Sequence, residues 1–202
     1  MGVYKAAFSA DVLRPVLWKG AVINTLPALA AMVLGVETAL SLVLTVSAVL
    51  GSWAFTADYR SGSFHRRVLL FQRVPAWTAR GASCALAAIL SAGVAGVGAG
   101  LPAALALAGA AGMGALWGFG LGSLIRSHMV SLFAVPLTLT VPRILLGPEG
   151  QYSQFVFPVL AADWAQQAAV NIPASGSFFG AVGWLVLVTA AALTVFTKRD
   201  LR

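Results

Sequence analysis

The residues best suited to binding or chemistry gather in one segment, from Asp58 to Arg80. It reads D-Y-R-S-G-S-F-H-R-R-V-L-L-F-Q-R-V-P-A-W-T-A-R, so that arginines are mixed with aromatic and aliphatic residues after Gly62. This pattern predicts a short amphipathic helix with positive charge and aromatic anchors. Such a helix either lies on lipid head groups or docks in a groove of a partner protein, and periodicity alone leaves both interpretations open.

Catalytic chemistry finds no support elsewhere in the chain. No G-x-x-x-x-G-K-[ST] loop is present to hold phosphate, and Gly-x-Gly patterns such as 112–114 lie inside apolar stretches. The histidines, His65 and His128, lie in separate segments, whereas a metal cage needs several neighbouring ligands. The single cysteine, Cys84, cannot form an internal disulfide and is expected to be a small core residue. We therefore expect no catalytic residue, no metal and no cofactor in this chain.

The elements that position these residues are expected to be membrane helices, because the composition leaves little else. Of the 202 residues, 59% are hydrophobic and 9% are charged. Soluble domains carry about 25% charged residues, so a soluble globular enzyme is excluded, and the high apolar content excludes disorder. A membrane-spanning helix needs about 20 residues, so six of them leave no room for a large soluble domain.

Charged residues divide the chain into six apolar blocks. The blocks cover residues 21–36, 38–55, 81–100, 103–125, 129 to about 143 and 178–196, with a tight turn at Leu101-Pro102. We predict an all-α, polytopic membrane protein in which residues 1–202 form a single domain with six transmembrane helices. The predicted connections include an interfacial helix over residues 1–18, a cytoplasmic coupling segment over 58–80 and an external segment over 148–177.

Basic residues fall almost entirely on one side of these six spans. If both termini share a side, every Lys and Arg except Arg143 belongs to that side. The acidic residues Glu37, Glu149 and Asp163 fall on the other side. Because Lys and Arg are enriched in cytoplasmic loops, this asymmetry predicts cytoplasmic N- and C-termini in a cell inner membrane. The net charge of +7 is therefore assigned to orientation and lipid contact, and no nucleic-acid partner is expected.

Two sets of residues within the predicted spans have structural and functional interpretations. Small residues at four-residue spacing predict close helix packing at Gly96, Gly100, Gly114, Gly118 and Gly122. Polar residues that either line a substrate path or form interhelical hydrogen bonds are Asn24, Thr38, Ser41, Thr138 and Thr140. Charged residues are almost absent from the predicted spans, which weakens an ion-coupled mechanism.

Three stretches of the sequence resemble the membrane subunits of type-2 ABC transporters, the ABC-2 type permeases. Residues 58–64 resemble the acidic-x-x-x-Gly-Thr stretch after the second span, with Asp58 in place of the usual Glu and Ser63 in place of Thr. Residues 120–128 are similar to the Gly-rich end of the fourth span and its cytoplasmic turn. Residues 196–201 are similar to the basic-Arg-Asp ending after the last span, so the likeness follows nearly the whole chain.

The resemblance implies the membrane-spanning permease subunit of an ATP-driven ABC exporter. It implies that a second membrane subunit, identical or homologous, completes a path for an amphipathic substrate such as a peptide, lipid or drug-like metabolite. Two separate ATPase subunits would bind ATP and Mg, so this chain would itself be no enzyme. The coupling helix would dock on the ATPase through Asp58, Arg60, Gly62, Ser63, Phe64, Arg66 and Arg67, with Phe64 as the anchor.

Two other functions stay open from the residues alone. An ion-coupled secondary transporter or small channel would need polar groups at membrane depth and, often, an internal repeat. The two halves of the chain show no convincing repeat. A membrane scaffold without transport activity is the third interpretation.

Overall fold

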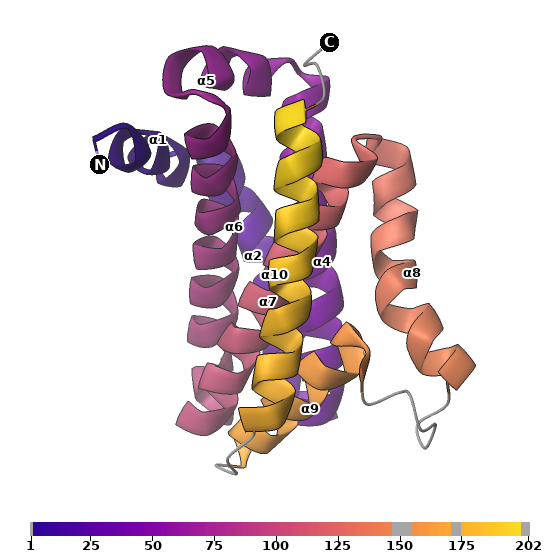
Figure 1. Cartoon of the computed structure of the whole chain (residues 1–202). Coiled ribbons are helices and arrows are strands. Elements are labelled where there is room, and N and C mark those ends of the chain that lie inside the picture. Colours follow the sequence, from indigo (N-terminus) through magenta and orange to yellow (C-terminus); the bar gives the residue numbers. More distant parts are fainter. Residues whose placement is uncertain (1, 147–154, 171–174, 199–202) are drawn as a thin grey trace.

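The structure is a computed structural model that describes residues 2–146, 155–170 and 175–198, and these residues form helices and short connections without a strand (Figure 1). In chain order the elements are α1 (Gly2–Val12), α2 (Pro15–Leu29), α3 (Ala31–Leu34), α4 (Val36–Arg60), α5 (Ser63–Phe71), α6 (Arg73–Gly96), the 3₁₀ helix η1 (Val97–Ala99), α7 (Leu101–Ile125), α8 (His128–Leu146), α9 (Phe157–Ala169) and α10 (Ser175–Lys198). The all-α class predicted from composition is confirmed.

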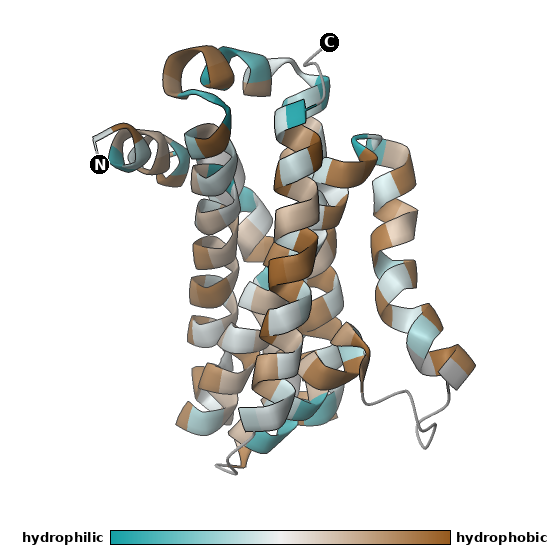
Figure 2. Ribbon diagram, viewed as in Figure 1, coloured by the Kyte–Doolittle hydropathy of each residue, from teal (hydrophilic) through white to brown (hydrophobic). Residues whose placement is uncertain are grey.

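Among the residues that the structure describes, four segments are long and apolar enough to cross a bilayer: Val36–Arg60, Arg73–Ala99, Leu101–Ile125 and Ser175–Lys198. They correspond to the apolar blocks predicted at 38–55, 81–100, 103–125 and 178–196. Figure 2 shows apolar residues along the shafts of the bundle and hydrophilic residues concentrated towards its ends. These features are those of a multi-pass membrane protein.

The other two predicted spans are shorter or interrupted. The first is divided between α2 and α3, which are separated at Ala30, and Pro27 lies inside α2. The fifth corresponds to α8, which has 19 residues and contains Pro136 and Pro142. Proline removes a backbone hydrogen bond and kinks a helix, so neither segment forms a long uninterrupted span. Helix length and composition therefore support four spans, and the predicted count of six is not confirmed.

Glycines allow α7 to approach α4 closely at the centre of the bundle. At Gly114 and Gly118 of α7, an added Cβ would collide with backbone atoms of α4, and at Gly122 it would lie 2.9 Å from the Cα of Ser52. Contacts this close are possible only where one helix has no side chain. The three glycines thus pack the chain's own bundle.

The two glycines predicted in the preceding span play different roles. At Gly96 of α6, an added Cβ would lie 2.7 Å from Leu107 of α7, so this glycine belongs to a helix contact. At Gly100 an added Cβ would come no closer than 4.0 Å to the one neighbour found, Pro102, so the close approach of another helix that was predicted here is not seen. The φ of Gly100, +102°, is a conformation that favours glycine, and Gly100 forms the turn into α7 immediately before Leu101.

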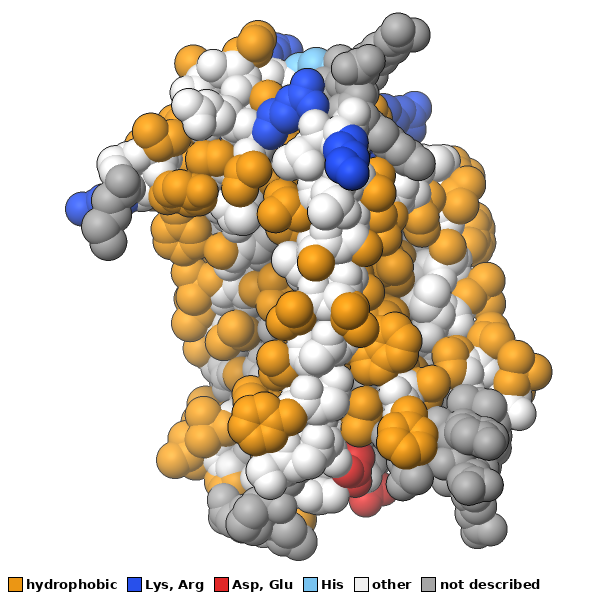
Figure 3. Space-filling model, viewed as in Figure 1, with side chains coloured by type: hydrophobic (Ala, Val, Ile, Leu, Met, Phe, Trp, Pro, Cys, Tyr) orange, Lys and Arg blue, Asp and Glu red, His pale blue; other side chains and the backbone are white. Residues whose placement is uncertain are grey.

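One end of the molecule carries α1, α5 and the last turn of α10, and we call it the basic end (Figure 1). Its exposed basic side chains include Lys5, Arg60, Arg66 and Lys198. Figure 3 shows Lys and Arg gathered at this end of the visible face and acidic side chains at the opposite end. At that opposite end, α9 packs against α7 and α10. Exposed basic side chains are therefore concentrated at one end of the bundle axis (Figure 3).

Several predicted boundaries differ from the observed ones. The interfacial helix predicted over residues 1–18 ends earlier, because α2 already begins at Pro15. The predicted coupling segment is shorter, since α4 reaches Arg60 and α6 begins at Arg73. Within the predicted external segment, residues 148–154 and 171–174 lie outside the described residues, and α9 occupies the part between them.

Candidate functional site

Sharp turns at both ends position α5. Gly62 precedes it with φ +68°, a left-handed conformation that glycine adopts without steric cost. The hydroxyl oxygens of Ser61 and Ser63 lie 3.2 and 3.3 Å from the carbonyl oxygen of Asp58, which secures this turn to the end of α4. Gln72 follows α5 with φ +68°, so α6 starts in a new direction. As a result, α5 lies across the basic end instead of continuing α4 (Figure 1).

The inner face of α5 is anchored in the chain's own core. Phe64 is fully buried, with its ring centroid 5.1 Å from that of Phe55 and 5.5 Å from that of Phe196. Trp77 and Phe119 belong to the same aromatic cluster. The sequence hypothesis made Phe64 the anchor in a partner ATPase. The structure contradicts that role, because aromatic residues of the same chain already enclose the side chain.

The opposite face of α5 is exposed. Residues of an α-helix advance by about 100° each, so Arg66, Leu69 and Leu70 lie opposite Phe64. Leu69 is 85% exposed and Leu70 is 74% exposed, and Arg66 beside them is also exposed. We call these three residues the α5 face. Two adjacent leucines on an outer helix are an apolar patch of the kind that a partner covers.

A cluster of charged residues joins α5 to the rest of the basic end. Arg67 of α5 pairs with Asp11 of α1. Arg80 of α6 pairs with Asp11 at 3.4 Å and with Asp58 of α4 at 3.0 Å. Arg14, between α1 and α2, pairs with Asp58 at 2.9 Å. Two carboxylates and three guanidinium groups thus tie together α1, α4, α5 and α6, and we call them the charge cluster.

Arg80 is the centre of the charge cluster. It is 2% exposed, and its Nη2 also lies 3.4 Å from the carbonyl oxygen of Ala54. A buried charge is strongly unfavourable without a partner, so the two carboxylates are what make this position tolerable. The sequence prediction placed Arg80 in a connecting segment because its charge seemed to end the apolar block. In the structure, α6 begins at Arg73, so Arg80 lies about two turns inside the helix.

The residues predicted to dock on an ATPase therefore divide into groups. Asp58 and Arg67 are engaged in ion pairs inside the chain. Gly62 shapes the turn before α5. Arg60 and Arg66 remain exposed, so they are the members of the predicted set that a partner can reach.

Sequence reasoning missed both Asp11 and Leu69 as residues of interest. Asp11 is fully buried although it belongs to the N-terminal helix, which was expected to lie on the membrane surface. In the sequence, the feature that could have pointed to an ion pair was a single acidic residue near the start of a chain rich in arginine. Leu69 was visible as part of the amphipathic pattern, but which face of α5 packs inward depends on Phe64 and its distant partners.

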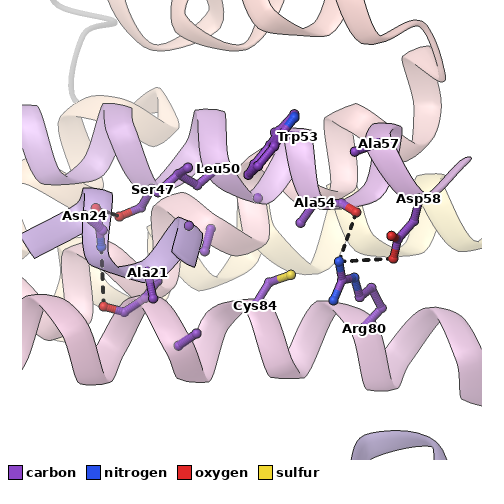
Figure 4. Close-up of a pocket in the computed structure, with 15 residues that line it drawn as sticks. Ala21, Asn24, Ser47, Leu50, Trp53, Ala54, Ala57, Asp58, Arg80 and Cys84 are labelled. Carbon is purple, nitrogen blue, oxygen red and sulfur yellow. Dashed lines mark hydrogen bonds and ion pairs between the residues drawn. The ribbon is translucent and has the colours of Figure 1, made fainter. Parts of the chain in front are cut away.

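A narrow cavity of about 50 Å³ lies between α2, α4 and α6 (Figure 4). Towards one end, the side-chain oxygen of Asn24 accepts a hydrogen bond from Ser47 at 2.9 Å. At the other end lies the ion pair of Arg80 and Asp58, and Cys84 lines the space between. One water needs about 10–15 Å³ of such space, so the cavity has room for a few water molecules.

The polar residues predicted to line a substrate path are distributed over α2, α4 and α8. Of the five, Asn24 lines the cavity; the others are Thr38 and Ser41 on α4 and Thr138 and Thr140 on α8. Thr138 accepts a hydrogen bond from the Trp117 indole at 3.1 Å, which joins α7 to α8. Thr140 is exposed, and its hydroxyl bonds to the carbonyl oxygen of Pro136 in its own helix. Hydrogen bonding between helices therefore accounts for Asn24 and Thr138.

The three stretches that resemble ABC-2 permeases meet at the basic end. Arg126, between α7 and α8, has its guanidinium carbon 5.3 Å from the centre of the Tyr59 ring and 5.9 Å from that of Phe196. Such distances are those of cation–π contacts. Tyr59, Arg126 and Phe196, one residue from each stretch, thus form one contact group, although they are far apart in the sequence.

Within the parts of the chain that the structure describes, no three His, Cys, Asp or Glu side chains gather as metal ligands would. No family model, curated protein or solved structure matches this chain. Function must therefore be inferred from the α5 face, the charge cluster, the cavity and the contact group around Arg126.

Proposed function

We propose that this chain is the membrane-spanning permease subunit of an ATP-driven ABC exporter, and that an ATPase subunit docks on the α5 face. The observation that carries the proposal is the two-sided character of α5. Phe64 and Arg67 fix its inner side to the bundle, while Leu69 and Leu70 stay exposed. A helix that passes movement from a partner to a bundle needs both properties, since a loosely held helix would move alone.

The charge distribution supports a cytoplasmic location for the basic end. In this orientation, α2 with α3 and α8 would be the first and fifth of six spans. At 1.5 Å per residue, residues 15–34 and 128–146 would extend at most about 30 and 28 Å, less the shortening at Ala30 and at the prolines, against a hydrocarbon thickness of about 30 Å. Both termini would then be cytoplasmic, in the cell inner membrane.

The proposed assembly has further members. Two ATPase subunits would bind at the basic end and use ATP and Mg, and a second membrane subunit, identical or homologous, would complete the path. The contact group around Arg126 supports the resemblance on which this rests, because it unites residues from all three resembling stretches beside α5. The substrate would be amphipathic, such as a peptide, a lipid or a drug-like metabolite.

A pull-down from native membranes in mild detergent tests the docking. Tagged wild type is compared with Leu69→Glu/Leu70→Glu and with the control Leu13→Glu, which alters a leucine that is 80% exposed beside α1. We expect an ATPase subunit with wild type and with the control, and none with the double variant. Absence of an ATPase from wild type, in several detergents and with nucleotide present, would overturn the exporter function. Retention by the double variant would overturn this docking surface and favour contact of α5 with lipid.

The cavity supports a second candidate, an ion-coupled secondary transporter or small channel. Asn24, Ser47, Asp58 and Arg80 are buried polar or charged residues that line one space between helices. Polar groups of this kind at membrane depth accompany ion pathways. Transport by the purified chain alone in lipid vesicles, driven by an ion gradient, would support this candidate against the exporter.

A further inference from the structure

One wall of the cavity is α2, and the part of α2 that faces the bundle has small or polar side chains. Among the described residues of α2, those that are buried are Gly20, Ala21, Asn24 and Ala28. Four of its large apolar side chains are 45–66% exposed, namely those of Val22, Ile23, Leu26 and Leu29. In a bilayer these four side chains contact lipid whether or not α2 touches the bundle. Outward movement of α2 therefore breaks few apolar contacts with the rest of the chain.

The packing of α2 against α4 is looser than that of α7 against α4. A Cβ atom added at Gly20 of α2 would lie 3.7 Å from the Trp53 ring and 3.9 Å from Leu50, which are ordinary van der Waals distances. A Cβ atom added at Gly118 of α7 would instead collide with the backbone of α4. The cavity of about 50 Å³ lies in the loosely packed region, between α2, α4 and α6. The interface that α2 forms with the bundle is thus incompletely filled.

Two polar contacts hold α2 in place. Asn24, which is fully buried, accepts a hydrogen bond from Ser47 of α4 at 2.9 Å, and its side-chain nitrogen lies 3.5 Å from the carbonyl oxygen of Ala88 in α6. Arg14, immediately before α2, pairs with Asp58 of α4 at 2.9 Å. Asn24 and Asp58 lie towards opposite ends of the cavity (Figure 4). We call these two contacts the Asn24 latch and the Arg14 latch.

The chain can bend at the end of α2 that is remote from Arg14. Pro27 has no N–H group, so it cannot donate a hydrogen bond to the carbonyl oxygen of Ile23, four residues earlier in the helix. Just beyond it, α2 ends at Leu29 and α3 begins at Ala31. A helix that two polar contacts hold, and that is interrupted near one end, can tilt about that end as a rigid piece.

We propose that α2 is a movable wall of the cavity, kept closed by the Asn24 and Arg14 latches and able to tilt outward about Pro27. The tilt would open the cavity sideways, so that a molecule dissolved in the membrane would reach Arg80 and Cys84 from the lipid. The bundle would stay assembled, because α4, α6 and α7 pack against one another without α2. This inference concerns this chain alone and does not depend on an ATPase partner.

Cys84 reports this movement, because it lines the cavity and is the one cysteine of the chain. The full chain in lipid vesicles is treated with N-ethylmaleimide, and the labelled fraction is followed over time by mass spectrometry of the intact protein. A buried thiol reacts through an open form, so the labelling rate follows the population of that form.

Four variants separate movement of α2 from other causes. Ser47→Ala removes the donor of the Asn24 latch without changing α2, and Arg14→Gln removes the other latch. Thr45→Val is the matched control, because the Thr45 hydroxyl bonds to a carbonyl oxygen of its own helix. Leu139→Ala controls for an overall loss of stability, since it removes a buried leucine of α8 that is not part of the cavity wall.

We expect slow labelling of wild type, Thr45→Val and Leu139→Ala. Ser47→Ala should be labelled about three- to tenfold faster than wild type, the factor that the loss of one buried hydrogen bond produces. Arg14→Gln should have a smaller effect, because the Arg14 side chain is 32% exposed and its ion pair is partly screened by water. Adding Pro27→Ala to Ser47→Ala should slow labelling again, because alanine restores a continuous helix.

Equal labelling rates of wild type and the Ser47→Ala/Arg14→Gln double variant would overturn the proposal, because α2 would not be held at these contacts. Equal acceleration by Leu139→Ala would overturn it too, since unfolding of the bundle would then expose Cys84. Rapid labelling of wild type would mean that the cavity has no closed wall. No slowing by Pro27→Ala would exclude a pivot at this residue.

Discussion

Replacing Asp11 and Asp58 with asparagine, separately and together, measures how strongly the two carboxylates of the charge cluster depend on each other. Each carboxylate shares Arg80 with the other, at 3.4 and 3.0 Å. Either single variant therefore leaves Arg80 with one carboxylate, and only the double variant leaves it with none in the described residues. Because Arg80 is 2% exposed and adjoins a cavity of only about 50 Å³, bulk water cannot replace the lost carboxylates and at most a few water molecules reach the guanidinium group. The loss of stability in the double variant should accordingly exceed the sum of the two single losses.

The magnitudes follow from the contacts. A hydrogen bond to a charged group contributes about 1.5–3 kcal/mol, so each single variant should lose about 2 kcal/mol of unfolding free energy. The coupling energy between mutations of contacting residues in one network is about 0.5–3 kcal/mol. For Asp11→Asn and Asp58→Asn it should lie near the upper limit, because the double variant leaves the buried Arg80 without a carboxylate. At about 2–4 °C per kcal/mol, each single variant should lower the unfolding midpoint by about 4–8 °C. The double variant should lower it by clearly more than both shifts together.

Thermal unfolding in detergent, followed by circular dichroism, provides the assay. Adding Arg80→Met to the double variant should restore part of the lost stability, because a buried site without any charge is often as stable as one with a complete ion pair. Asp163→Asn, at the opposite end of the bundle, is the control and should add to Asp11→Asn without coupling. If the stability loss of the double variant equals the sum of the two single losses within about 0.5 kcal/mol, the two carboxylates do not share Arg80 in the way proposed. No recovery of stability with Arg80→Met would refute this sharing as well.

Three further predictions concern the core. Gly118→Leu should lower the unfolding free energy by about 1–3 kcal/mol, because any side chain at Gly118 meets the backbone of α4. The control Gly183→Ala meets nothing within 4 Å and should change the unfolding free energy by less than about 0.5 kcal/mol. Calorimetry distinguishes the two variants, and equal unfolding midpoints would contradict the close packing of α4 and α7. Phe64→Ala should cost about 3–5 kcal/mol of unfolding free energy and Leu69→Ser less than about 0.5 kcal/mol, so a reversed order in thermal unfolding would mean that α5 packs through its other face. Cys84, 6% exposed beside a cavity of about 50 Å³, should react with N-ethylmaleimide only after denaturation, and rapid labelling of the folded chain would show a wider opening.

Hydropathy was sufficient to predict the helices that make up most of the bundle. Runs of apolar residues bounded by charges located α4, α6, α7 and α10. A turn was predicted at Leu101-Pro102; in the structure these two residues begin α7, and the turn lies at Gly100 immediately before them. These features are local, because length, apolar content and turn residues act within a few positions of the chain. Interrupted segments were harder to predict, since Pro27 and Pro136 allow either a bent span or a break.

The charge cluster and the orientation of α5 were beyond sequence reasoning because they depend on partners far along the chain. Arg80 was read as the end of a connecting segment, although a buried carboxylate from α1, 69 residues away, allows it to lie inside a helix. The same limit applied to Phe64. An amphipathic pattern shows that α5 has two faces, but only the positions of Phe55 and Phe196 decide which face packs inward.

The central position of α7 has a consequence for the order in which the chain assembles during synthesis. Of the apolar stretch of α7, 72% is buried inside the bundle, compared with 17% for α10. α4 packs mainly against α7, so the ribosome releases α4 and α6 before the helix that joins them exists. Until residue 125 has emerged, both helices wait in lipid or beside an insertase with their small-residue faces uncovered. The helices made afterwards, α8 to α10, are then added around a bundle in which α7 already joins α4 to α6.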